Sequence, residues 1–190
     1  MTEFEFIFAL YALALGLSLV EVLSGLGRTL ELRFASDAGG DQFTIGWLTP
    51  LLAIFVILDL LSFWMFSWSV QNFVSVTSST LLAVVVFASA YYLAARLVFP
   101  SDPDRFTSLD THYFRVCRTV MGMLIALVVV QWVYLLSLPQ VREQLLSPLT
   151  IGPTVLFVAM MAILIVSRSR RVHAVVLVAL SVRYLVLYLQ

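Results

Sequence analysis

Three ionisable residues lie inside long apolar runs of this sequence: Glu21, Asp59 and Arg183. Hydrophobic residues make up 62% of the chain, so the surroundings of these three residues are compatible with lipid. A charged side chain at the centre of a bilayer costs about 2.5–3.5 kcal/mol on insertion scales. Such side chains therefore face a protein interior, where they handle protons or ions or fix the packing of helices.

Glu21 belongs to a polar face of the first apolar run. Residues three or four positions apart form this face: Ser18, Glu21, Gly25 and Arg28. This spacing places them on one side of a helix. The sequence leaves two interpretations of Glu21 open. It is either a carboxylate that carries a proton or cation, or a structural carboxylate bonded to Arg28, Arg118 or a neighbouring hydroxyl.

Asp59 and Arg183 lie at matching depths in two runs that enter the membrane from the same side. Asp59 follows the start of its run by about 13 residues, or about 20 Å of helix, and Arg183 has a similar place in the last run. Because an unpaired charge at this depth is costly, we predict that the two side chains pair directly or through water. The pair either breaks and re-forms during transport or is a static link between helices.

Acidic residues and a histidine gather in the third loop: Asp102, Asp104, Asp110 and His112. Oxygen and imidazole ligands can bind a divalent cation, which makes these residues weak metal candidates. Their spacing matches no complete metal-site pattern, however. Asp-Pro-Asp is also an ordinary turn, and Asp110 is placed to cap the next helix. We therefore expect neither a metal nor a cofactor.

Six stretches are long and apolar enough to cross a hydrocarbon core about 30 Å thick. They cover about residues 5–26, 45–68, 76–98, 114–136, 151–166 and 172–189. They are apolar on every side, unlike the alternating strands of outer-membrane barrels. We predict an all-α integral membrane protein in which six transmembrane helices form a compact bundle and one domain over residues 1–190. The remaining loops are too short for a soluble domain.

Glycine and proline residues indicate where some of these helices begin and end. Gly25 and Gly27 predict a helix exit near residue 26. Pro50 suits the first turn of the second helix, and Pro148 and Pro153 flank the start of the fifth.

Arginine is concentrated in alternate loops. The first, third and fifth loops and their borders contain Arg28, Arg33, Arg96, Arg105, Arg115, Arg118, Arg168, Arg170 and Arg171, and the other two loops contain only Arg142. The positive-inside rule assigns the Arg-rich side to the cytoplasm. The acidic N-terminus does not resemble a signal peptide. We therefore predict a multi-pass protein of the bacterial inner membrane with both termini in the periplasm, and headgroup contacts for Arg168, Arg170 and Arg171.

These observations leave three classes of function. A transporter or channel-like bundle for a proton, ion or small solute is supported by the buried charges together with Gln131 and the adjacent Tyr91 and Tyr92. An accessory, assembly or interaction subunit of a larger membrane complex is the alternative. The partners we expect are the lipid bilayer and either further copies of the chain or a membrane complex. A lipid-acting enzyme using the third-loop acids is the second alternative, although no nucleophile, zinc or phosphate-binding motif occurs. The formal net charge of +0 argues against nucleic acid as a partner.

Overall fold

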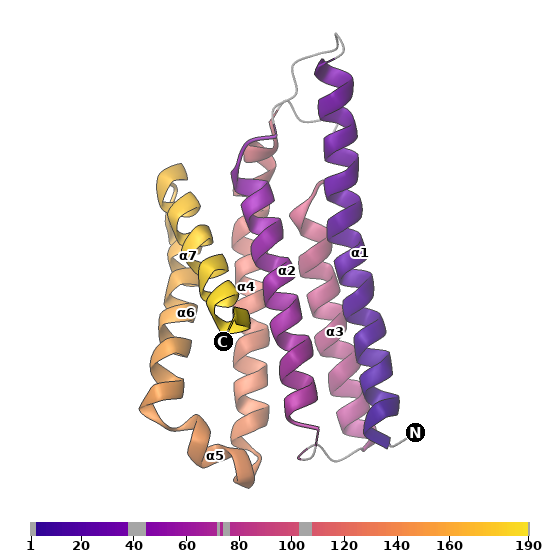
Figure 1. The fold of residues 1–190 in the computed structure, drawn as a ribbon, viewed down its shortest axis with the longest axis vertical. Helices are drawn as coiled ribbons and strands as arrows, with labels where there is room; N and C mark the ends of the chain where they lie inside the picture. Colours follow the sequence, from indigo (N-terminus) through magenta and orange to yellow (C-terminus); the bar gives the residue numbers. More distant parts are fainter. Residues whose placement is uncertain (1–2, 38–44, 72, 74–76, 103–107, 190) are drawn as a thin grey trace.

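The computed structural model describes residues 3–37, 45–71, 73, 77–102 and 108–189, and its regular elements there are α-helices. The elements are α1 (Glu3–Asp37), α2 (Leu48–Ser69), α3 (Ser78–Val98), α4 (Leu109–Leu136), α5 (Pro139–Leu145), α6 (Pro148–Val166) and α7 (Arg170–Leu189). All except the short α5 are long and apolar enough to cross a membrane, and they run in alternating directions (Figure 1). The chain is therefore a polytopic helical membrane protein, as predicted.

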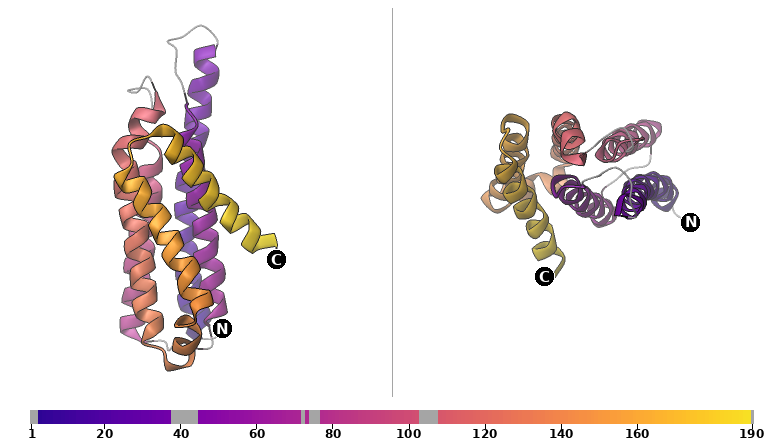
Figure 2. Two further views of the ribbon diagram at one scale, coloured as in Figure 1. Left: turned by 90° about the vertical axis from the view of Figure 1, so that its left-hand side faces the viewer. Right: turned by 90° about the horizontal axis from the view of Figure 1, so that it is seen from above.

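Helices α1 to α4 form the main bundle. Helix α1 packs on α2 and α3, and α4 packs on α2 and α3, so these four helices surround a common interior (Figure 2). Helix α6 packs on α4, and α7 packs on α2 and α6. Helix α7 crosses the bundle obliquely, and its C-terminal end projects away from the other helices (Figure 2). Within the main bundle, α7 therefore packs mainly on α2.

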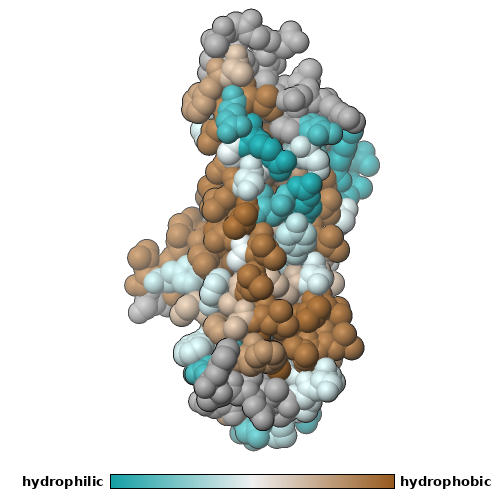
Figure 3. All heavy atoms as spheres, turned by 90° about the vertical axis from the view of Figure 1, so that its right-hand side faces the viewer, coloured by the Kyte–Doolittle hydropathy of each residue, from teal (hydrophilic) through white to brown (hydrophobic). Residues whose placement is uncertain are grey.

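One end of the bundle, here called the Arg-rich end, is formed where α1, α3 and α6 end and α2, α4 and α7 begin (Figure 1). All the arginines predicted to share a side lie at or near this end, except that Arg105 is outside the described residues. Hydrophilic side chains gather in the upper half of the face that carries α1, above a hydrophobic surface (Figure 3). The end carrying α5 and the start of α1 is called the opposite end.

The predicted end of the first helix near residue 26 is wrong, because α1 continues to Asp37. Gly25 is not a helix exit but a position of close approach. A β-carbon built on Gly25 would lie 2.5 Å from Cβ of Phe99, the residue that follows α3. Gly25 therefore lets α1 approach the end of α3 while the helix continues.

The other helix boundaries differ from the prediction by a few residues. Helix α4 begins at Leu109 after Ser108, whose extended backbone forms the N-cap, so Asp110 lies in the first turn rather than at the cap. Pro148 occupies the first turn of α6, which places Pro153 inside the helix. Pro50 lies in the first turn of α2, as expected. Helix α5 was not predicted, because seven residues are too few to give a hydropathy signal.

We expect Gly25→Ala to destabilise the protein, since a methyl group at this position must displace Phe99 from a buried site. Overpacking of this kind costs about 1–3 kcal/mol, which exceeds the gain of about 1 kcal/mol from replacing a helical glycine by alanine. Thermal unfolding in detergent measures the change. Gly27→Ala is the matched control, because a β-carbon at residue 27 meets no atom within 4 Å. A Gly25→Ala protein as stable as Gly27→Ala would contradict this account of the contact.

Candidate functional site

The Asp59 carboxylate lies in the interior of the bundle, where three helices meet. Its side chain is 1% exposed. The Tyr184 hydroxyl of α7 donates a hydrogen bond to Asp59 Oδ1 at 2.6 Å, and the Tyr91 hydroxyl of α3 lies 3.1 Å from Oδ2. The Tyr91 hydroxyl also lies 2.8 Å from the carbonyl oxygen of Val56, one turn earlier in α2. A carboxylate of α2 thus joins α3 and α7 through two neutral hydroxyl groups.

Arg183 is directed to a different neighbour. Its guanidinium lies 4.5 Å from the centre of the Phe157 ring in α6 and 5.2 Å from the centre of the Tyr184 ring. Over the described residues, Asp59 and Arg183 form no direct ion pair. Adjacent residues of a helix point about 100° apart, so Tyr184 faces Asp59 while Arg183 faces α6. Asp59 and Arg183 both contact Tyr184, which agrees with the prediction that they lie at the same depth. A connection between Asp59 and Arg183 through water stays a prediction.

Glu21 joins α1 to α3 near the Arg-rich end. Its carboxylate forms an ion pair with Arg96 of α3 and lies 3.9 Å from a guanidinium nitrogen of Arg28. Arg96 also donates to the Ser101 hydroxyl at 3.2 Å. The Glu21 side chain is 19% exposed, so the pair is at the border of the bundle. Of the predicted partners of Glu21, Arg28 is nearby, whereas Arg118 does not pair with it. The ion pair with Arg96 was not predicted, although Glu21 and Arg96 both lie in the Arg-rich half.

Ser18 and Gln131 have separate surroundings. The Ser18 hydroxyl donates to the carbonyl oxygen of Ala14 within α1 at 3.0 Å, so it makes no polar bond to another helix. Gln131 of α4 lines a groove of about 480 Å³ at the opposite end of the bundle. Helices α1 to α4 all contribute to this groove, and most of its lining is apolar. The predicted polar residues are therefore not gathered in one cluster.

A chain of aromatic contacts leads from this groove to Asp59. The groove is lined by Tyr11, Phe63 and Phe87, among others. The Phe63 ring lies 5.1 Å from the Phe87 ring and 5.6 Å from the Tyr91 ring, measured between centres. Tyr91 in turn contacts Asp59 through its hydroxyl. Phe63 and Phe87 are here called the aromatic layer; both rings line the groove, and Phe63 packs against Tyr91.

The third-loop residues that the structure describes do not converge on one point. Asp110 Oδ2 lies 3.8 Å from a guanidinium nitrogen of Arg170, and His112 Nε2 lies 3.1 Å from the carbonyl oxygen of Leu97. Asp102 lies in the loop after α3, and Asp104 is outside the described residues. Within the described ranges, no group of three His, Cys, Asp or Glu residues is placed to hold a metal ion.

The sequence did not predict the contact of Tyr184 with Asp59 or the contacts among Tyr113, His173 and Cys117. Tyr184 gave no signal in the sequence beyond its position beside Arg183. The Tyr113 hydroxyl of α4 lies 2.6 Å from His173 Nδ1 of α7, and the Cys117 thiol lies 3.3 Å from the same hydroxyl. His173 follows the turn that carries Arg168, Arg170 and Arg171, and the sequence does not indicate its partner. Its pairing depends on how α4 and α7 are rotated, which hydropathy does not reveal.

Removal of the Tyr184 hydroxyl should destabilise the protein. Tyr184→Phe leaves Asp59 Oδ1 buried without its donor, at a cost of about 1–3 kcal/mol. Tyr188→Phe is the matched control, because the Tyr188 hydroxyl is bonded to the Leu58 carbonyl oxygen on the exposed side of the same helix pair. Its loss should cost about 0.5 kcal/mol or less. Thermal unfolding in detergent measures both; equal losses would contradict a special role for the buried hydrogen bond.

Known proteins supply no family for this chain. Its sequence matches no protein-family model, and no curated protein or solved structure matches it. Function must therefore be inferred from the geometry of the described residues.

Proposed function

We propose that this protein moves a proton, alone or together with a small solute, and that Asp59 takes up and releases the proton. The support is a fully buried carboxyl group whose two side-chain hydrogen-bond partners are both neutral hydroxyls. An ionised carboxyl accepts both hydrogen bonds, whereas a protonated one donates one and accepts one. Asp59 can therefore stay hydrogen-bonded in either state. Ionisable residues at this depth mark proton and ion pathways.

The observation that carries this proposal is the position of the groove. It extends from the opposite end of the bundle to the aromatic layer, and Tyr91, which contacts Asp59, packs against Phe63. We propose that this arrangement is a closed state. Rotation of the two rings would connect Asp59 to the groove, and the groove to the membrane surface. The polar amide of Gln131 lies on this route.

An interaction subunit of a membrane complex is the second candidate, and the projection of α7 favours it. The C-terminal part of α7 extends away from the bundle and exposes Val182, Leu185 and Val186 (Figure 2). Small residues on a helix can also serve partner helices, but in α3 Ala94 is fully buried and Ala90 packs against the core, so these two residues do not favour this candidate. A stable hetero-complex on purification would support this candidate, whereas a pure single species would count against it.

A lipid-acting enzyme has the least support. Asp110 contacts Arg170 and His112 contacts a backbone carbonyl, so neither is poised beside the other as a catalytic pair.

For location, we propose the bacterial inner membrane with both termini in the periplasm. The gathering of arginine at one end of the bundle supports this orientation.

Proteoliposomes containing an entrapped pH dye test the proposal. Under an imposed membrane potential, we expect wild-type protein to carry a proton flux and Asp59→Asn to reduce it to the level of protein-free vesicles. Asparagine keeps the shape and one acceptor oxygen but cannot exchange a proton. Glu21→Gln is the matched control, since Glu21 lies away from the groove and the aromatic layer. Wild-type flux in the Asp59→Asn protein would overturn the role of Asp59.

Infrared spectroscopy tests proton exchange without a known solute. A carboxyl band that Asp59→Asn removes should change with pH while the protein stays folded. A band that does not respond to pH at any value where the fold persists would contradict proton uptake at Asp59.

A further inference from the structure

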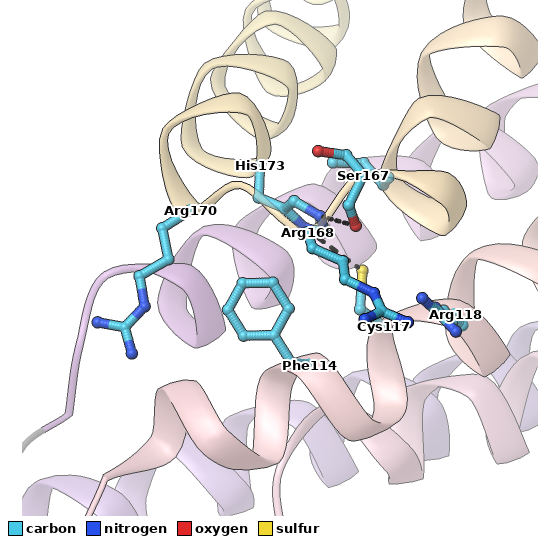
Figure 4. Close-up of a pocket in the computed structure, with 8 residues that line it drawn as sticks. Phe114, Cys117, Arg118, Ser167, Arg168, Arg170 and His173 are labelled. Carbon is cyan, nitrogen blue, oxygen red and sulfur yellow. Dashed lines mark hydrogen bonds between the residues drawn. The ribbon is translucent and has the colours of Figure 1, made fainter.

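A cavity of about 360 Å³ lies at the Arg-rich end, away from Asp59 and the groove. It is formed by α4, the turn after α6 and the start of α7. Its lining includes Phe114, Cys117, Arg118, Ser167, Arg168 and His173 (Figure 4). None of these residues has a part in the proposed handling of a proton. The cavity therefore needs an explanation of its own.

Two guanidinium groups line this cavity, those of Arg118 and Arg168. Within the part of the chain that the structure describes, no carboxylate forms an ion pair with Arg118 or Arg168. Arg170, which also borders the cavity, is close to Asp110 and lies on the other side of Phe114 from Arg168 and Arg118 (Figure 4). Two like charges around one cavity repel each other. An anion between them would remove this repulsion and gain charge-assisted hydrogen bonds.

The turn that borders the cavity is held against α4 by two hydrogen bonds of His173. His173 Nδ1 pairs with the Tyr113 hydroxyl at 2.6 Å, and His173 Nε2 lies 3.1 Å from the carbonyl oxygen of Ser167. These contacts fix the turn that carries Arg168 against α4, which carries Arg118. Binding at a preorganised site costs less ordering entropy than binding to free surface side chains.

The depth of the two arginines indicates what kind of anion reaches them. Arg118 precedes the end of α4 by 18 residues, or about 27 Å of helix. Arg168 follows α6, whose 19 residues span about 28 Å. The hydrocarbon core is about 30 Å thick, so both side chains lie at its border. Lipid phosphate groups lie at this level.

We propose that this cavity is a phosphate-binding site and that Arg118 and Arg168 hold the phosphate group of an anionic phospholipid. The guanidinium fork matches the geometry of phosphate oxygens and stays charged when it is partly desolvated. The Ser167 hydroxyl borders the same cavity and can donate a further hydrogen bond. Free phosphate shares this chemistry, so the experiment must separate the two sources.

Native mass spectrometry of the detergent-solubilised protein tests the site with phosphatidylglycerol as the probe. Diacylglycerol with the same chains is the reference lipid, because it lacks the phosphate group. We expect retained phosphatidylglycerol and little retained diacylglycerol. Arg118→Gln and Arg168→Gln should each weaken phosphatidylglycerol binding about tenfold. Circular dichroism checks that each variant keeps its helices.

Arg171→Gln is the matched control. Arg171 is exposed in the same turn and has the same charge, but it does not line the cavity. We expect its replacement to weaken binding less than about twofold. Equal losses in Arg168→Gln and Arg171→Gln would overturn the proposal, because they would indicate general attraction to a basic surface. Equal retention of both lipids would overturn it as well.

Added inorganic phosphate separates the two sources of the anion. Displacement of phosphatidylglycerol by inorganic phosphate would show that the phosphate group alone is recognised. Retention of the lipid in the presence of phosphate would show that the chains contribute to binding. Either result supports the site, provided that Arg118→Gln and Arg168→Gln weaken binding and Arg171→Gln does not.

Discussion

The arrangement of this bundle depends on one buried carboxyl group and the two tyrosine hydroxyls that reach it. Apolar helices gain little from contact with one another in lipid, since lipid chains are equally apolar. Polar contacts and close packing must therefore select which helix faces meet. Asp59 joins α2 to α3 through Tyr91 and to α7 through Tyr184. The C-terminal end of α7 leans away from the bundle (Figure 2). The hydrogen bond from Tyr184 to Asp59 lies where α7 is still close to α2.

Other polar contacts place the remaining helices near the Arg-rich end. Glu21 and Arg96 join α1 to α3, and the Thr49 hydroxyl donates to the Leu109 carbonyl oxygen at 3.2 Å, which joins α2 to α4. His173 and Tyr113 join α7 to α4. By contrast, the groove at the opposite end is lined mainly by apolar side chains. The Arg-rich half is thus held by directional bonds, while the other half is held by ring packing, which can rearrange at lower cost.

Hydropathy and charge predicted the six spans, their alternating course and the gathering of arginine at one end, because these properties depend on composition along each segment. The partners of the buried charges could not be predicted in the same way. Their positions along the helices predicted that Asp59 and Arg183 lie at the same depth. Because of the rotation of α7 about its axis, however, the Asp59 carboxylate is bonded to Tyr184, and the Arg183 guanidinium lies over the ring of Phe157. The role of Gly25 was misjudged for a related reason. The rule that glycine marks the end of a helix considers only residues near it in the sequence, whereas Gly25 is in close contact with Phe99, which follows α3.

The helices also differ in length, and this has a mechanical consequence. Helix α1 has 35 residues and α4 has 28, whereas α6 has 19 and α7 has 20. At 1.5 Å per residue, these lengths are about 52, 42, 28 and 30 Å. Helices α6 and α7 therefore match a hydrocarbon core of about 30 Å, as do α2 with 22 residues and α3 with 21, whereas the extra turns of α1 and α4 extend past the core at the Arg-rich end. A change in bilayer thickness acts most directly on the helices that match the core, and two of these, α2 and α7, are joined by the hydrogen bond from Tyr184 to Asp59.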